Sequence, residues 1–190
     1  MRLGLFGGTF DPPHVGHLIA AQDALTVLGL DRVHFIPAAR PPHKQSRSIS
    51  PARVRAALLR AAIGDDDRFV LDEIELSRTG PSFTVDTLRE YARHDAAAEL
   101  FLLIGADQWA EFETWREPDD VRRLARVVVL TREGEGGEAA GVTVVPVTRI
   151  DVTSTDIRRR VAEGLPFRYL VPDAVADMIQ QQGLYLPVGQ

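Results

Sequence analysis

The sequence predicts an α/β fold in which a doubly wound parallel sheet is covered by helices. Short apolar runs typical of buried strands alternate along the chain with longer segments whose apolar residues recur at helical spacing. The run at residues 100–104, LFLLI, is apolar without interruption, which is typical of a central parallel strand. Ligands of such sheets bind at the carboxyl ends of the strands, where the strand order reverses. We therefore expect functional residues in the loops that follow strands.

Six strands are expected from runs of apolar and β-branched residues. In chain order they occupy residues 3–6, 32–36, 70–76, 100–104, 126–130 and 142–147. The first run ends at Gly7-Gly8 and leads directly into a segment of helical periodicity. Residues 133–141 are rich in glycine and glutamate, and we interpret them as a mobile surface loop. The crossovers between parallel strands should be right-handed.

Helices are expected between these strands and after the last of them. In chain order they occupy residues 18–28, 51–63, 84–91, 118–124, 154–163 and 172–182. Gly29, Gly64 and Gly164 directly follow three of them, as is common at helix ends. Ser50 is expected to cap the second helix with Pro51 at its first position, and Ser154 is expected to open the fifth.

Composition limits the classes of function. The 190 residues are 45% hydrophobic and 26% charged, which suits one folded domain. The net charge of -5 gives no general attraction to nucleic acid or anionic lipid, so an anionic ligand has to be held locally. The absence of cysteine excludes disulfides, thiolate nucleophiles and cysteine zinc sites. No apolar stretch resembles a signal peptide or a membrane span, so we expect a cytoplasmic protein without a membrane partner.

The loop at residues 7–17, GGTFDPPHVGH, has the features of a phosphate site. Its glycines allow a ligand to approach the backbone, and it leads to a helix N-terminus with unpaired N–H groups. His14 and His17 are three residues apart, so both project from one face of the first helical turn and can donate to one anion. Alternatively, the two histidines continue the buried stripe of this helix, although the glycines and prolines around them favour phosphate binding.

Two further segments have similar properties. Around Ser154, hydroxyl groups and amides lie at the start of a helix and Arg158 lies one turn later, which indicates a second phosphate site; a capped surface helix is the alternative. Asp107 follows the strand at 100–104, where it would accept from a ribose hydroxyl, help to orient a metal-bound triphosphate, or simply cap a helix. Lys44, the only lysine of the chain, lies in a proline-rich loop.

These segments resemble the nicotinate-nucleotide adenylyltransferases, a family of the HxGH nucleotidyltransferase superfamily. GGTFDPPHVGHL matches the family's first loop, and VTSTDIR at residues 152–158 resembles its ISSTxIR motif. GAD at residues 105–107 and PPHK at residues 41–44 resemble two more of its motifs. PSFT at residues 81–84 and TWR at residues 114–116 resemble its acceptor-recognition segments, with Phe83 where many relatives have tyrosine. The resemblance runs from residue 3 to residue 185, apart from residues 133–141.

The resemblance implies a Rossmann-like doubly wound parallel sheet of the nucleotidyltransferase superfamily and three groups of site residues. Catalysis would depend on His14, His17 and Arg158. ATP would be bound by Gly7, Gly8, Thr9, Phe10, Gly16, Gly105, Asp107, Ser154, Thr155 and Ile157. The acceptor would be bound by Asp11, His43, Lys44, Phe83, Thr84, Trp115 and Arg116. Trp115 also fits a partly buried core position, the commoner place for an isolated tryptophan.

The implied reaction is adenylyl transfer from ATP to nicotinate mononucleotide in NAD biosynthesis, giving deamido-NAD and pyrophosphate. Mg²⁺ would be carried by ATP, because the sequence shows no carboxylate cluster for a protein-borne cation. The whole chain, 1–190, would form one domain, with a C-terminal helical part at about residues 154–185 completing the ATP site.

Several alternatives stay open at this point. The acceptor could instead be nicotinamide mononucleotide or phosphopantetheine, or the chain could be a nucleotide-binding regulator without turnover. An RNA-binding synthetase relative is a third alternative, but the negative charge and the lack of a KMSKS loop count against it and against a nucleic-acid partner. A homo-oligomer is compatible with the sequence, which does not define the oligomeric state.

Overall fold

The computed structural model describes residues 1–40, 49–132, 137–139 and 141–187. Within them, strands form one seven-stranded sheet of order β3-β2-β1-β4-β5-β7-β6. The strands are β1 (Arg2–Gly8), β2 (Arg32–Pro37), β3 (Phe69–Leu71), β4 (Glu99–Gly105), β5 (Arg126–Thr131), β6 (Gly137–Ala139) and β7 (Val142–Pro146). The helices are α1 (Val15–Leu28), α2 (Ala52–Ile63), α3 (Thr84–His94), α4 (Ala106–Ala110), α5 (Pro118–Leu124), α6 (Ser154–Ala162) and α7 (Asp173–Gln181), with short 3-10 turns η2 (Phe112–Thr114) and η3 (Arg168–Leu170).

The central strand is β1, which pairs in parallel with both β2 and β4. Leu3 lies opposite Arg32 on one side and Leu100 on the other. The chain builds one side of the sheet through β2 and β3 and then returns to build the other side from β4, so the strand order reverses between β1 and β4. The predicted doubly wound parallel sheet is therefore confirmed, with β6 as an antiparallel addition beside β7.

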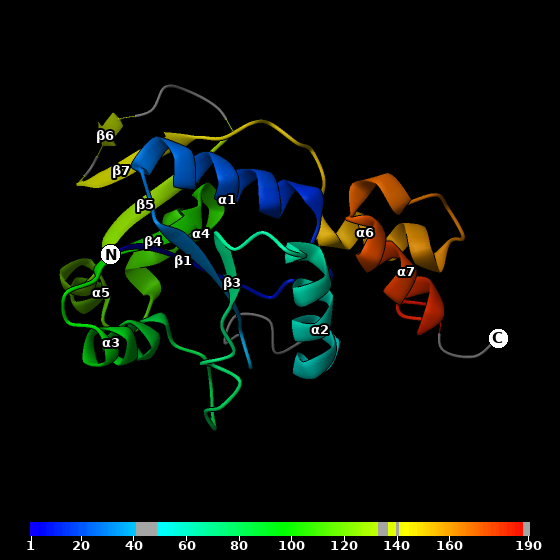
Figure 1. Ribbon diagram of the computed structural model, residues 1–190, viewed down its shortest axis with the longest axis horizontal. Coiled ribbons are helices and arrows are strands. Elements are labelled where there is room, and N and C mark those ends of the chain that lie inside the picture. The colour runs from blue at the N-terminus through cyan, green and yellow to red at the C-terminus, as the bar shows by residue number, and fades with distance from the viewer. Residues whose placement is uncertain (41–48, 133–136, 140, 188–190) are drawn as a thin grey trace.

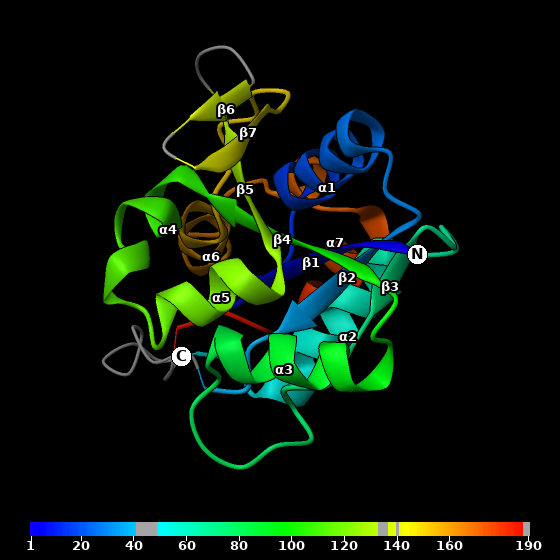
Figure 2. The same cartoon turned by 90° about the vertical axis from the view of Figure 1, so that its left-hand side faces the viewer.

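Both faces of the sheet are covered by helices (Figures 1 and 2). Successive residues of β4 show why, because they point alternately to the two faces. Leu102 belongs to the core cluster that includes residues of α3 and α5, whereas Phe101 belongs to the cluster that includes residues of α1 and α2. All five residues from Leu100 to Ile104 are buried, as the uninterrupted apolar run predicts.

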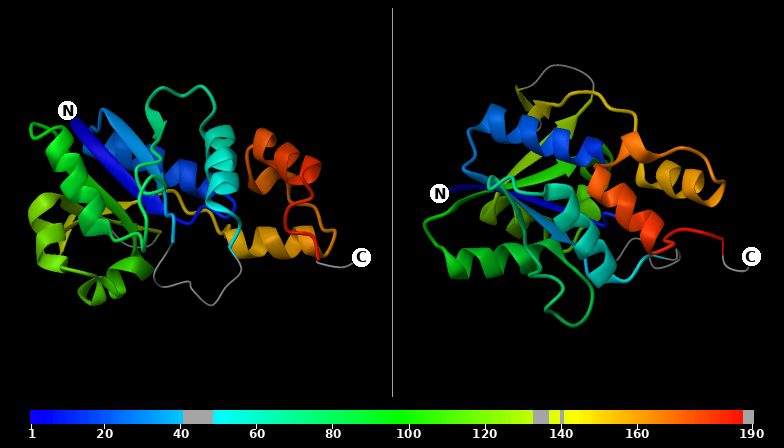
Figure 3. Two further views of the ribbon diagram at one scale, coloured as in Figure 1. Left: turned by 90° about the horizontal axis from the view of Figure 1, so that it is seen from below. Right: turned by 45° about the vertical axis from the view of Figure 1, so that its right-hand side comes forward.

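The C-terminal helices form a third cluster with α2. Ile157 of α6, Ile179 of α7 and Leu58 of α2 are each at most 1% exposed in it. Figures 1 and 3 place α6 and α7 together at the end of the molecule opposite to α3 and α5. The chain thus returns past the carboxyl ends of the parallel strands before it reaches α6.

Several expected boundaries are wrong by a few residues. Pro51, not Ser50, directly precedes α2, and no side chain caps that helix. Thr153 caps α6 by accepting from the amide of Asp156 at 3.0 Å, so Ser154 is the first helical residue and not the cap. The strand expected at residues 70–76 is confined to β3, because the carboxylate of Asp72 accepts from the amide of Ile74 at 2.9 Å and turns the chain.

The segment interpreted as a mobile loop, residues 133–141, contains a strand. Residues Gly137–Ala139 form β6, which pairs antiparallel with β7 and places Glu138 opposite Thr143. Of the other residues of the expected loop, 133–136 and 140 lie outside the described residues, and Gly141 forms the turn before β7. The short elements α4, η2 and η3 were not expected as separate elements.

Candidate active site

A cavity of about 730 Å³ lies at the carboxyl ends of β1, β4 and β5. All predicted site residues that the structure describes line it, with the exception of Ile157. The side chain of Ile157 is fully buried in the C-terminal cluster, and its amide donates to Thr153 within α6, so it presents no donor to the cavity. His43 and Lys44 lie outside the described residues.

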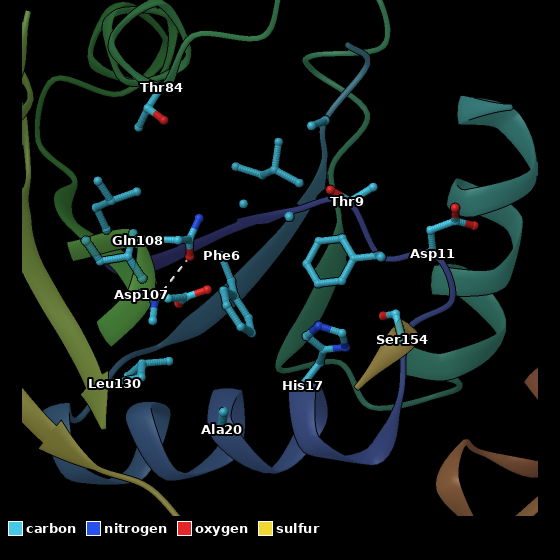
Figure 4. A pocket seen from close by; sticks show the side chains of 18 of the residues that line it. Phe6, Thr9, Asp11, His17, Ala20, Thr84, Asp107, Gln108, Leu130 and Ser154 are labelled. Atoms are coloured by element: carbon cyan, nitrogen blue, oxygen red, sulfur yellow. Dashed lines mark hydrogen bonds between the residues drawn. The ribbon is translucent and has the colours of Figure 1, made fainter. Parts of the chain in front are cut away.

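The cavity has two ends (Figure 4). One end is formed by the loop at residues 9–17 and the first turn of α6, and Asp11, His17 and Ser154 lie there. We call it the phosphate end, after the ligand that the sequence predicts for these segments. The other end is formed by residues 82–84 and 115–116, and Thr84 lies there at the start of α3; we call it the acceptor end for the same reason. The cavity lies over the carboxyl ends of β1 and β4, the switch point at which a doubly wound sheet binds its ligand.

His14 and His17 stack on each other at the phosphate end, with ring centroids 3.7 Å apart. The amide of His14 donates to Nδ1 of His17 at 3.2 Å. We assign the proton of neutral His17 to Nε2 on the basis of this bond, because Nδ1 acts as an acceptor. In this tautomer His17 carries its N–H group on Nε2.

His14 is 6% exposed, and within the described part of the chain its Nδ1 has no hydrogen-bond partner. Burial, assisted by the positive charge of Arg132, lowers the pKa of His14 from 6.5 to about 4. The ring is therefore neutral at pH 7. A buried polar atom without a partner at a cavity wall is suited to receive one from a ligand.

Neighbouring side chains closely approach two glycines in this site. A Cβ atom on Gly16 would lie 3.1 Å from Nδ1 of His14, so a larger residue would disturb the stacked histidines. A Cβ atom on Gly105 would lie 2.6 Å from Oδ1 of Asp107. The amide of Gly105 also donates to the side chain of Gln108 at 3.1 Å, which fixes the turn from β4 into α4 (Figure 4).

Segments distant in sequence are joined at the phosphate end. The hydroxyl of Ser154 donates to the carbonyl of Pro12 at 2.8 Å, across 142 residues of sequence. Nη1 of Arg158 donates to the carbonyl of Asp11 at 2.7 Å, and Nη2 donates to the hydroxyl of Thr155 at 3.2 Å. The first turn of α6, the positive end of its dipole, is thereby held beside the loop at residues 9–17, which we call the histidine loop.

Asp11 was expected to contact the acceptor, but its carboxylate bonds to the protein itself. Oδ1 accepts from the hydroxyl of Tyr185 at 2.8 Å, and Oδ2 accepts from the amide of Ser50 at 3.1 Å. The residue is only 4% exposed. In this structure Asp11 therefore connects three segments of the protein at the wall of the cavity.

The acceptor end is built from aromatic and charged side chains. The guanidinium of Arg116 lies over the ring of Phe83 at 4.9 Å and pairs with Asp86 at 3.6 Å. Trp115 packs against Phe112 with centroids 5.2 Å apart and also lines the cavity. Both interpretations of Trp115 are thus compatible with the structure, because one part of the side chain contacts the core and another part borders the cavity.

Sequence reasoning missed several residues of this site, and Arg55 is the clearest case. Its side chain is 1% exposed, and it donates to the carbonyls of Thr9 at 2.7 Å, Ala38 at 2.7 Å and Ser50 at 3.0 Å. Burial lowers the pKa of Arg55, while the nearby carboxylate of Asp11 opposes that change. An arginine within a helical pattern looks like a solvent-exposed residue, so the sequence carried no signal for this role.

Glu75 at the acceptor end was missed as well. It is 8% exposed and lines the cavity, and it accepts from the hydroxyl of Thr87 at 2.7 Å. Burial raises the pKa of Glu75 above its ordinary value, although the donors around it oppose this. Ser82, Gln108, Arg132 and Tyr185 are further residues at or beside the cavity that the sequence analysis did not single out.

The described residues contain no group of three or more His, Asp or Glu side chains placed to hold a metal ion. None of the helices among them has both the length and the apolar character needed to cross a membrane.

Comparisons with known proteins cover almost the whole chain. The profile of a family described as cytidylyltransferase-like matches residues 5–160. A Thermus thermophilus protein named "Probable nicotinate-nucleotide adenylyltransferase" is 48% identical over 187 residues, which cover 97% of this chain and 100% of that protein. A Shouchella clausii protein of the same name is 41% identical, with 97% of this chain and 96% of that protein covered.

A solved structure shows the same fold. The Plasmodium falciparum nicotinic acid mononucleotide adenylyltransferase complexed with NaAD superposes with a TM-score of 0.81, covering 97% of each chain at 13% identity. At that identity the likeness concerns the fold alone, which is the Rossmann-like sheet described above.

Proposed function

This chain belongs to the cytidylyltransferase-like family and, within it, to the nicotinate-nucleotide adenylyltransferases, and on that premise we propose how its cavity performs the reaction. The enzyme transfers the adenylyl group of ATP to nicotinate mononucleotide in NAD biosynthesis, giving deamido-NAD and pyrophosphate. The observation that supports this best is that the two segments predicted to bind phosphate and the two predicted to bind the acceptor, far apart in sequence, line one cavity at the β1/β4 switch point.

In the proposed mechanism a phosphate oxygen of the acceptor attacks the α-phosphorus of ATP in line. A new bond forms between that oxygen and the α-phosphorus, and the bond from the α-phosphorus to the bridging oxygen breaks, releasing pyrophosphate. No side-chain nucleophile is needed, so the protein contributes positioning and charge stabilisation. Nε2–H of His17 donates to the transferring phosphate, and His14 lies directly beside it.

The leaving phosphates are assigned to the first turn of α6. Arg158 supplies a permanent positive charge, and Ser154 and Thr155 supply hydroxyl groups at the positive end of the helix dipole. Mg²⁺ belongs to the substrate MgATP in this proposal, because phosphate oxygens and water are the ligands that the ion prefers. Gly105 and Asp107 border the nucleoside part of ATP, at the end of β4.

At the acceptor end, the ring of Trp115 stacks on the pyridine ring, and Thr84 with neighbouring amides donates to the carboxylate. Phe83 and Arg116 form the adjacent wall. We further propose that residues 1–190 act as one domain whose part at about 154–185 completes the ATP site. A cytoplasmic location and the lack of nucleic-acid or membrane partners belong to the same proposal, and sedimentation would measure the oligomeric state.

The test is to incubate the protein with MgATP and a panel of acceptors and to measure pyrophosphate release. We expect release with nicotinate mononucleotide, and less with nicotinamide mononucleotide and phosphopantetheine. Release only with another acceptor would keep the nucleotidyltransferase chemistry and overturn the substrate. Binding of ATP without release for any acceptor would identify a nucleotide-binding regulator instead.

A further inference from the structure

Tyr185 points its hydroxyl group at Asp11, 174 residues away in the sequence. The O–H donates to Oδ1 of Asp11 at 2.8 Å, and burial together with the carboxylate raises the pKa of Tyr185 above its ordinary value. The backbone of Tyr185 has a φ of 65°, a left-handed conformation that residues with a side chain rarely adopt. Such a conformation persists only where its surroundings fix it, so this is a defined contact and not a loosely attached tail.

Asp11 accepts hydrogen bonds from three different segments. Oδ1 accepts from Tyr185, Oδ2 accepts from the amide of Ser50 before α2, and the carbonyl accepts from Arg158 of α6 at 2.7 Å. We call Asp11, Ser50, Arg55, Arg158 and Tyr185 the Asp11 cluster. One residue of the histidine loop thereby joins α2, α6 and the C-terminal segment.

The cluster fixes the loop firmly on the side of α2. Arg55 is buried, and all three of its guanidinium nitrogens donate to backbone carbonyls, including that of Thr9 in the loop. A buried charge with this many partners holds the backbone in one arrangement, because any shift leaves donors unpaired at a large cost. The loop therefore has a rigid support whose hydrogen bonds come from Arg55 and not from Tyr185, although Tyr185 lies near Arg55 and its hydroxyl also contacts the side chain of Ser50.

The support on the side of α6 is different, because it depends on polar contacts at the cavity itself. Ser154 and Arg158 both bond to the loop, yet both are assigned to the triphosphate and would have to share these bonds with it. Tyr185 packs against the core cluster that contains Ile157 of α6, and it bonds to Asp11 without lining the cavity. It can thus connect α6 to the loop whether or not ATP is bound.

We propose that Tyr185 is a positioning residue for ATP, whose hydrogen bond to Asp11 holds the first turn of α6 in register with the loop of His14 and His17. This inference rests on the proposed function, in which one triphosphate contacts both segments. Loss of the hydroxyl leaves Oδ1 of a buried carboxylate without its donor, and the carboxylate then relaxes toward other partners. The distance between Arg158 and the histidines changes as a result, while the acceptor end is unaffected.

The chain offers a matched control in Tyr91. Its hydroxyl also donates to an aspartate, Asp72, and it lies 2.8 Å from a ring nitrogen of His34. Tyr91 is 8% exposed and does not line the cavity. Tyr185→Phe and Tyr91→Phe therefore each remove one hydroxyl group that donates to a partly or fully buried carboxylate. Only Tyr185→Phe does so beside the phosphate end.

The experiment measures, for the wild type and both variants, the melting temperature, the Kd of MgATP without acceptor, and kcat and KM for both substrates. For Tyr185→Phe we expect the Kd of MgATP to rise about fivefold to twentyfold and kcat to fall by a similar factor. This is the size of effect expected when a hydrogen bond to a charged group, here the carboxylate of Asp11, is lost. The KM of the acceptor should stay within about twofold. Tyr91→Phe should lower the melting temperature and leave the Kd and kcat unchanged.

Two results would overturn the inference. One is a Tyr185→Phe variant that binds MgATP like the wild type, and the other is a loss of ATP affinity in both variants that follows their melting temperatures. If the wild type releases no pyrophosphate with any acceptor, the proposed function fails, whereas the titration with MgATP alone still decides the role of Tyr185. In the double variant Tyr185→Phe/Arg158→Ala, the loss of MgATP binding free energy should be smaller than the sum of the losses in the two single variants. The reason is that both changes act on the position of α6.

Discussion

The two ends of the cavity are held together in different ways. At the phosphate end, side chains bond to backbone carbonyls of distant segments, as Ser154 does to Pro12 and Arg158 does to Asp11. At the acceptor end, aromatic and charged side chains contact one another, as Arg116 does with Phe83, and the guanidinium side chain is half exposed. In the proposed function, the phosphate end is thus preorganised for charge, whereas the acceptor end presents a surface for ring stacking. We expect changes at the first to reduce the rate and changes at the second to alter the choice of acceptor.

The largest effect is expected for His17→Ala. Loss of a preorganised donor to transition-state charge lowers kcat about 100- to 1,000-fold. The melting temperature should scarcely change, because the ring borders the cavity. Pyrophosphate release and thermal unfolding measure the two quantities. His94→Ala is a matched control, since its side chain is 74% exposed at the end of α3.

If the His17→Ala variant keeps more than about half of the wild-type kcat, His17 does not stabilise the transition state. A large drop in melting temperature would instead support the alternative in which the histidines belong to the buried stripe of α1. Either result would remove the contrast between the two ends of the cavity.

Arg158→Ala should have the next largest effect. Because the guanidinium is assigned to the leaving phosphates, the Kd of MgATP should rise about tenfold or more, and pyrophosphate inhibition should weaken. Acceptor affinity should be nearly unchanged. Arg159→Ala is the control on the same helix, since Arg159 pairs with Asp156 at 2.6 Å and Glu163 at 2.7 Å and does not line the cavity. A fall in acceptor affinity with unchanged ATP affinity would show that Arg158 binds the acceptor and not the leaving phosphates of ATP.

At the acceptor end we expect a change of selectivity instead of a loss of rate. Nicotinate mononucleotide should be preferred over its nicotinamide analogue at least about tenfold in kcat/KM. The reason is that the NH₂ group of a carboxamide would face the hydrogen-bond donors of the site and leave them unpaired. Trp115→Ala should weaken both acceptors, since stacking does not depend on the ring's substituent. Thr84→Val should narrow the ratio between them. Competition assays at fixed MgATP measure the ratio, and equal efficiency with both acceptors would contradict the nicotinate assignment.

The smallest expected effect is on the pH dependence of stability. The pKa of His14 is lowered from 6.5 to about 4 in the folded protein, so the unfolded chain binds more protons between these values. The free energy of unfolding therefore decreases as the pH falls through this window. Denaturant titrations at about pH 7.5 and pH 5 should show that the wild type loses about 1 to 2 kcal/mol more than His14→Gln. Identical losses would show that His14 is not buried in its neutral form.

Glu75, at the acceptor end, contributes to the pH dependence of the free energy of unfolding with the sign opposite to that of His14. Burial raises its pKa above 4.5, so the folded protein holds the proton to higher pH than the unfolded chain does. Its contribution to the free energy of unfolding therefore decreases as the pH rises through that range, and Glu75→Gln should remove this slope.

Most of the fold was predictable because its signals are local. Strand β4 is an apolar run, α1 ends directly before Gly29, and α5 has the expected bounds. Strand β6 was missed because three residues, Gly137–Ala139, carry no alternation that distinguishes a strand from a loop. The cap of α6 was placed one residue late because Thr153, Ser154 and Thr155 all have suitable hydroxyl groups.

The site was predictable to the extent that its motifs are contiguous in sequence. The histidine pair and the hydroxyl groups of α6 lie in such motifs, and the structure brings both to one cavity. The partners of Asp11 were not predictable, because a bond to Tyr185 across 174 residues leaves no trace in local spacing. Arg55 was missed for the same reason, since its three acceptors belong to the loops around residues 9, 38 and 50.

The position of β1 at the centre of the sheet has a consequence for how the protein is made. Its partner β4 begins 97 residues after β1 does, at Glu99, and Tyr185 comes later still. A ribosome therefore delivers the first strand and the histidine loop long before the segments that complete them, and pairings of such long sequence separation form slowly. A nascent chain that has reached α5 has the central strands but neither Ser154 nor Arg158, so under the proposed function the ability to hold a triphosphate arises only near the end of synthesis.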